Sequence, residues 1–321
     1  MTASAAVKDR WELMRALAAI ADGPDAGRAV GPALGLEPVS DAEHTDVFVL
    51  NLPPYAAVYL GPDGALGGEG ADRVAGFWRA VGITPPAEPD HLSALLGLYV
   101  NLGEAALDAR RPATVAALTR SRATLFWEHL WPWLPGYLDA VTDLGAPALA
   151  GWAHLARRVI DAEFRTQPAC PRLPLALRQA PQLVSRQAGP GAGSRELTAA
   201  LTTPVRSGMI LTRRRLALGA ALAGVGHRIG ERRFTMRAML EQDPAATLSW
   251  LATEADRWQR LHSARGDGAR GDDDGVGETS QWWAARAART GKFLRDRAAE
   301  ASASEASAGT AQGEPTEVMR L

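Results

Sequence analysis

The stretch Phe126-Trp127-Glu128-His129-Leu130-Trp131-Pro132-Trp133-Leu134-Pro135-Gly136-Tyr137 (126–137) crowds three of the ten tryptophans into twelve residues, and we call it the aromatic corner. Pro132 has no N–H to donate and disfavours helical backbone at the residue before it. We therefore expect one helix to end near Trp131 and another to begin at Pro132. Such a corner is more typical of a core, although it could also form one wall of a binding groove.

The sequence on both sides of the corner has helical periodicity. No segment alternates with period two, so the sequence predicts an all-α bundle over residues 1–165. Apolar side chains recur at helical spacing in the segments 7–21, 69–81, 90–109, 112–131, 132–143 and 146–164.

The second half is organised differently. Its prolines predict a linker over 166–193, and its patterning predicts an additional helical C-terminal segment over 194–262. The Gly/Asp-rich and low-complexity composition of 263–321 predicts a flexible linker, a basic helix and a disordered tail.

Charge divides the chain into two unlike halves. Residues 1–170 hold 20 acidic and 13 basic side chains, whereas residues 171–321 hold 16 acidic and 22 basic ones. An acidic half attracts a basic ligand or a basic neighbour, and the second half could be that neighbour. With one cysteine, no signal-peptide pattern and no long apolar run, the sequence predicts a cytosolic protein.

Sequence motifs that announce catalysis are missing. The chain has no GxxxxGK[ST] phosphate loop, no GxSxG nucleophile motif and no CxxC, and its six histidines lack metal-ligand spacing. We therefore expect neither a catalytic centre nor a metal or other cofactor.

Two further stretches are unusual. The first is Leu52-Pro-Pro-Tyr-Ala-Ala-Val-Tyr-Leu-Gly61, and the second is Glu88-Pro-Asp-His91 at the start of a leucine-rich helix. Carboxylates near a helix start are favoured by the helix dipole, so simple capping would explain the second stretch. Alternatively, Asp90 and His91 could present a titratable pair beside a groove.

In this order, LPPYAAVYLG (52–61), EPDH (88–91) and FWEHLWPWLPGYLDAV (126–141) resemble the TorD/DmsD family of redox-enzyme maturation chaperones, over roughly residues 1–165. The resemblance implies an all-α, non-catalytic cytoplasmic chaperone. Its partner would be the twin-arginine signal peptide or the body of an apo-molybdoenzyme, held until the molybdenum cofactor is inserted. Whether the chain is a monomer or a homodimer stays open.

The resemblance also implies a client-binding surface. Acidic groups such as Glu88 and Asp90 would pair with arginines, and aromatic rings would receive the apolar part of a peptide. We expect at least one of the polar or aromatic side chains of the corner to reach this surface, while Phe126, Leu130 and Leu134 are buried. The candidate residues are Tyr55, Tyr59, Trp78, Glu88, Asp90, His91, His129, Trp131 and Trp133.

The second half leaves other functions open. Residues 205–237 hold eight arginines and one acid, so a helical nucleic-acid-binding regulator is the main alternative, and a nucleotide hydrolase lacks any supporting motif. Within this region, Thr212-Arg-Arg-Arg-Leu-Ala-Leu-Gly-Ala-Ala-Leu-Ala-Gly224 itself resembles a twin-arginine signal and could be an internal pseudo-ligand. The favoured interpretation is ordinary helix packing through Leu211, Leu218, Leu222, Val225 and Ile229.

Overall fold

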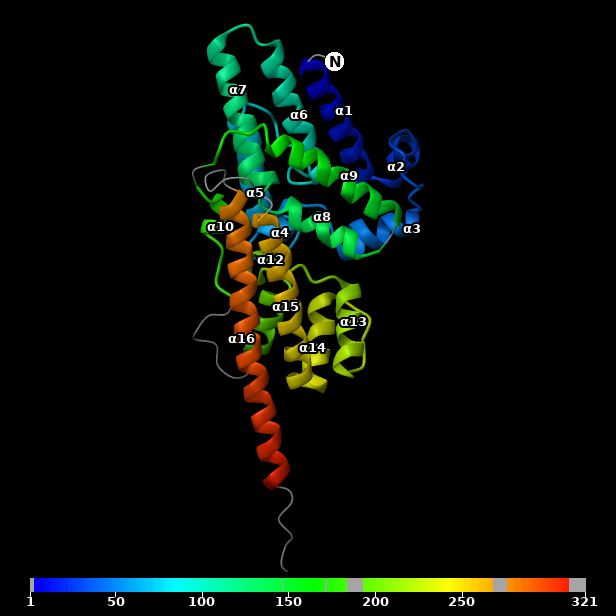
Figure 1. Cartoon of the computed structure of the whole chain (residues 1–321), viewed down its shortest axis with the longest axis vertical. Coiled ribbons are helices and arrows are strands. Elements are labelled where there is room, and N and C mark those ends of the chain that lie inside the picture. The colour runs from blue at the N-terminus through cyan, green and yellow to red at the C-terminus, as the bar shows by residue number, and fades with distance from the viewer. Residues whose placement is uncertain (1–2, 146, 171, 184–192, 268–275, 312–321) are drawn as a thin grey trace, which may run out of the picture.

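A computed structural model describes residues 3–145, 147–170, 172–183, 193–267 and 276–311. All regular elements of the described residues are helices, with no strand and a single isolated antiparallel bridge between Tyr55 and His91, so the predicted all-α class is confirmed. Figure 1 shows the first half at one end of an elongated molecule and the second half packed beneath it.

The helices of the first half form the bundle predicted from periodicity. They are α1 (Ala3–Asp22), α2 (Pro24–Val30), α3 (Asp41–His44), α4 (Ala56–Leu60), α5 (Gly68–Ala80), α6 (Leu92–Asp108), α7 (Pro112–Leu125), α8 (Leu134–Asp143) and α9 (Pro147–Phe164), with a 3₁₀ turn η1 (Gly31–Leu34). The run from Tyr55 to Leu60 contains the short helix α4.

Two segments of this half adopt the wide π-helical turn, and each ends just before proline. They are η2 (Thr45–Asn51) and η3 (Phe126–Leu130). Leu52 N–H donates to Val47 O over 2.7 Å, and Trp131 N–H donates to Phe126 O over 2.8 Å, each across five residues. Leu52 before Pro53 leaves helical backbone, whereas Trp131 before Pro132 keeps it, so at Pro132 it is the proline's missing N–H that ends the hydrogen-bond ladder after the wider turn. The predicted break at Pro132 is confirmed.

The second half contains α10 (Leu175–Arg178), α11 (Gly193–Leu201), α12 (Pro204–Ser207), α13 (Arg213–Ala223), α14 (Arg232–Gln242), α15 (Pro244–Asp267) and α16 (Val276–Ala311). Helices α15 and α16 pack along one another, and α16 extends past α14 and α15 at its carboxyl end (Figure 1). One buried apolar cluster runs through both halves.

The linker and tail expected in residues 263–321 are wrong where the structure describes them. Helix α15 continues to Asp267, and α16 covers 276–311. Alanine has the highest helix propensity, so an Ala-rich stretch of low complexity can still be helical. Residues 268–275 and 312–321 lie outside the described residues. The division into domains at 166–193 stays a prediction.

Candidate functional site

The two motifs at 52–61 and 88–91 are joined by backbone hydrogen bonds. Ala56 N–H donates to Asp90 O over 3.0 Å, and Leu92 N–H donates to Pro54 O over 2.8 Å. The Trp78 indole donates to Pro89 O over 3.0 Å and fixes this segment on α5. These hydrogen bonds bring the two motifs together. The prolines of both motifs have no N–H to donate, so their segments are fixed by accepting hydrogen bonds at carbonyl oxygens.

Asp90 is a buried structural residue. Its Oδ2 accepts the Ala57 N–H over 2.9 Å and so caps the first turn of α4. Burial raises the pKa of Asp90, and the hydrogen bonds from the backbone of Ala57 and of Asp90 itself act in the opposite direction. Asp90 as a whole is 2% exposed, so a client arginine cannot reach its carboxylate in this conformation.

His91 caps the next helix, α6. Its Nδ1 accepts the Ser93 N–H over 3.2 Å and lies 2.6 Å from Ser93 Oγ, which donates to Asp22 over 2.7 Å. Burial lowers the pKa of His91, and the surrounding carboxylates of Asp22, Glu88 and Asp90 partly offset this effect. Asp22 comes from the end of α1, and the sequence pattern gave no sign of it.

Above these buried groups lies a small acidic surface, the Tyr55 rim, formed by Asp22, Tyr55 and Glu88. The Tyr55 ring packs edge-on against His91 at 4.7 Å between centroids and is half-buried, while both carboxyl groups are exposed. Burial, followed by a hydrogen bond to Glu88, raises the pKa of Tyr55 to about 12. Among the described residues, no arginine or lysine forms an ion pair with either carboxylate.

A depression of about 350 Å³ lies beside the rim. Its walls are the proline-rich segment on either side of Glu88 and the outer face of α5. Most of the lining is apolar or glycine, with Asp72 and Arg79 as the charged members; the remaining residues are Gly67, Gly68, Ala71, Ala75, Pro85, Pro86, Ala87 and Pro89.

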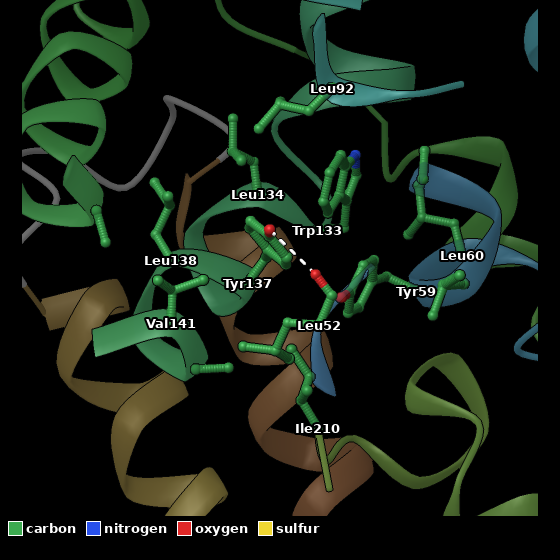
Figure 2. Packing of buried hydrophobic residues seen from close by; sticks show 14 of the residues in the cluster. Leu52, Tyr59, Leu60, Leu92, Trp133, Leu134, Tyr137, Leu138, Val141 and Ile210 are labelled. Carbon is green, nitrogen blue, oxygen red and sulfur yellow. Dashed lines mark hydrogen bonds between the residues drawn. The ribbon is translucent and has the colours of Figure 1, made fainter. Parts of the chain in front are cut away.

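The aromatic corner lies in the core. Tyr59 stacks on Trp133 at 5.1 Å with 7° between the rings, and the Tyr137 hydroxyl donates to Leu52 O over 3.2 Å (Figure 2). Trp131 stacks on Phe164 at 4.6 Å. The contacts of Trp133 and Tyr137 join the corner to the motif at 52–61.

The expected exposure at the corner is wrong, however. His129, Trp131 and Trp133 are 6%, 7% and 2% exposed, and Trp78 and Tyr59 are buried as well. His129 packs against Phe77 and Trp131 against Phe164, both in the first half, and the second half of the chain supplies the rest of the cover. The Trp283 indole on α16 donates to Pro132 O over 2.8 Å, and Ile210 packs beside Leu52 in the same cluster (Figure 2).

Only a small cavity of about 30 Å³ remains between the corner and its cover, room for about one water molecule. His262 closes it by stacking on Trp283 at 5.7 Å and by hydrogen bonding through Nε2 with Gly208 O at 3.0 Å. Burial and the adjacent Arg265 lower the pKa of His262 to about 3, so this imidazole is neutral at physiological pH and Arg265 is the charged side chain of the lining.

The interpretation that the basic second half attracts the acidic first half is confirmed at α8. Arg265 on α15 forms an ion pair with Asp139. Asp143 lies 3.5 Å from Arg257 and 3.8 Å from Arg215. Some of the excess carboxylates of the first half are therefore paired with arginines of the second half.

The segment that resembles a twin-arginine signal is the packed helix α13. Its Arg213 N–H donates to Asn51 over 3.0 Å and Arg214 donates to Leu144 O, so it lies away from the Tyr55 rim. A Cβ on Gly219 would lie 2.3 Å from the Trp250 ring, which shows how tightly α13 packs on α15.

The packing face of this region agrees with the predicted one at Leu211 and Val225 and differs from it elsewhere. Leu216 and Ala220 are buried with Gly219, whereas Leu218, Leu222 and Ile229 are exposed. The arginines of 205–237 mostly contact the protein itself, which disfavours a phosphate-binding stripe; those with side-chain partners are Arg206, Arg214, Arg215, Arg232 and Arg233.

Two kinds of feature are absent from the described ranges. No helix there is long and apolar enough to cross a membrane. No three His, Cys, Asp or Glu side chains there are grouped to hold a metal ion.

Comparison with known proteins gives one match. Residues 35–139 match the family described as nitrate reductase delta subunit, and this range includes all nine candidate site residues. Neither curated proteins nor solved structures give a match to the chain. The match over residues 35–139 supports the resemblance to TorD-type chaperones, a family that acts in molybdoenzyme maturation.

Proposed function

We propose that this chain is a cytosolic chaperone that binds an arginine-containing segment of its apo-molybdoenzyme client, such as a twin-arginine signal peptide, until the molybdenum cofactor is inserted. The observation that carries the proposal is the Tyr55 rim. Its two exposed carboxylates, Asp22 and Glu88, form no ion pair with an arginine or lysine among the described residues, and Asp22 lies 3.6 Å from the Nδ1 of His91.

The rim suits a pair of guanidinium groups. Arginine forms planar, two-pronged hydrogen bonds with carboxylates, and the half-buried Tyr55 ring offers a face for cation–π contact. The hydroxyl of Tyr55, hydrogen bonded to Glu88, keeps its proton at neutral pH because its pKa is about 12. A peptide cation would therefore meet two carboxylates and one neutral hydroxyl oxygen that can accept a hydrogen bond.

The apolar part of the peptide would lie in the adjoining depression. Prolines and alanines there present an apolar wall that extends from Glu88 along α5. The buried candidates would act as support: Trp78, Asp90 and His91 fix the rim from below, and Tyr59, His129, Trp131 and Trp133 form the packed layer behind it.

Calorimetric titration tests this proposal. The ligand is a synthetic peptide with two adjacent arginines followed by an apolar stretch, and its partner peptide has lysines instead. We expect the arginine peptide to bind more tightly, and binding to the double variant Asp22→Asn, Glu88→Gln to weaken by about tenfold. The control is Asp296→Asn, an exposed carboxylate on α16.

The outcomes separate two kinds of failure. No binding of the arginine peptide by the wild-type chain would refute the signal-peptide part of the proposal. Equal binding by the wild-type chain and the double variant would place the peptide elsewhere on the molecule.

A further inference from the structure

A second surface, unrelated to the Tyr55 rim, carries an unusual density of exposed apolar side chains. Of the nine large apolar residues exposed in the described parts of the chain, four fall between residues 218 and 234. They are Leu218, Leu222, Ile229 and Phe234, and Ile229 is 90% exposed. We call these four, together with Arg228, the Ile229 surface.

This exposure is not the result of a loose helix. Helix α13 packs on α15 through Gly219, and the loop after it is held in place by Gln242, which accepts the Gly226 N–H over 2.8 Å and donates to Gly226 O over 3.0 Å. Thr235 donates to Arg228 O over 2.9 Å. An ordered loop therefore presents Ile229 to solvent.

The charges around these side chains are positive. Exposed His227 and Arg228 precede Ile229, and the described residues place no carboxylate within ion-pair distance of Arg228 or Arg237. Glu231, the one acid between 205 and 237, is used as the cap of α14, where it accepts the Phe234 N–H over 3.3 Å.

The shape of the surface selects among partners. A helix-binding site is a groove whose apolar walls are partly buried, and a side chain 90% exposed is a protrusion instead. None of the cavities described above is lined by these residues. Nucleic acid would use the arginines but would leave the exposed leucine and isoleucine side chains in water.

We propose that the Ile229 surface docks on an anionic lipid surface. Apolar side chains that enter the headgroup region, next to arginines that meet anionic headgroups, are the combination that peripheral membrane contact requires. Figure 1 shows α13 at the outer edge of the second half, on the side away from α16, where a flat bilayer can approach. The contact is peripheral and independent of client binding at the Tyr55 rim.

Vesicle flotation of the full chain tests the proposal. We expect binding to vesicles of phosphatidylcholine mixed with phosphatidylglycerol, little binding to phosphatidylcholine alone, and release at high salt. Ile229→Ser should lower partitioning by about tenfold and Arg228→Gln by about fivefold. The matched control is Leu107→Ser, which removes a side chain 53% exposed at the end of α6.

Several results would overturn this inference. They are absent binding of the wild-type chain, equal binding to neutral vesicles, and an equal effect of Leu107→Ser. A fourth is salt-sensitive binding to duplex DNA that Arg228→Gln weakens and Ile229→Ser does not, which would assign the surface to nucleic acid. Because Ile229 contacts little of the protein, Ile229→Ser should leave the melting temperature and peptide affinity unchanged.

Discussion

Replacement of Trp283 by alanine should greatly weaken the union of the two halves. The side chain is 7% exposed, stacks on His262 and donates its indole hydrogen bond to Pro132 O. Truncation of a buried tryptophan costs about 3–5 kcal/mol, because both the transfer free energy and the new cavity count against the folded state. That loss is a large share of the roughly 5–15 kcal/mol by which a protein of this kind is stable.

Two companion variants divide this cost. Trp283→Phe retains most of the apolar volume but leaves the buried Pro132 carbonyl without its donor, which should cost about 1–3 kcal/mol. Trp282→Ala removes the neighbouring ring, which is half-exposed and lies under Arg286, and should cost less than Trp283→Ala.

Urea unfolding followed by circular dichroism and by tryptophan fluorescence measures all three variants. If the halves unfold as one unit, the two signals of the wild-type chain coincide, and Trp283→Ala either shifts both or separates them. A loss below about 1 kcal/mol for Trp283→Ala would refute the idea that α16 seals the aromatic corner.

Two further predictions concern buried polar groups. Glu163→Gln should destabilise the fold by about 3 kcal/mol, measured from the urea midpoint. Arg122 and the Tyr99 hydroxyl both lie 2.5 Å from the buried Glu163 carboxylate, and Arg122 would lose its counter-charge. An unchanged midpoint would contradict this. Burial lowers the pKa of His129 to about 4 and that of His262 to about 3, so the unfolded chain takes up protons below about pH 6.5 while the folded chain does not. Stability should therefore fall with decreasing pH, by about 2 kcal/mol per histidine between pH 7 and pH 5, and His129→Gln should make the urea midpoint less dependent on pH.

The sequence was informative where the physics is local. Pro132 interrupts the helix because of its own ring and missing donor, and the bundle of the first half follows from apolar periodicity. The coming together of the motifs at 52–61, 88–91 and 126–137 was expected from their resemblance to a known family, and the contacts of Tyr59 with Trp133 and of Ala57 with Asp90 agree with it.

The sequence was less informative where contacts between distant segments determine which side chains are buried. The burial of Trp131 and Trp133 depends on a helix about 150 residues further along, and no periodicity within the corner could reveal that cover. Asp22 joins the rim because α1 ends beside His91, again a tertiary fact. In α13 the choice of packing face was set by Gly219, whose lack of a side chain lets the Trp250 ring approach; the apolar pattern alone pointed to Leu218 and Leu222.

The cover over the aromatic corner also has a consequence for how the protein is made. A ribosome completes residues 35–139 long before it adds Trp283, so the nascent first half should expose Tyr59 and Trp133 to solvent until the rest of the chain arrives. During that interval the young chaperone exposes the kind of apolar surface that chaperones themselves recognise. A fragment that stops after the first half would keep this surface open permanently, and it should aggregate even though every helix of the bundle is present.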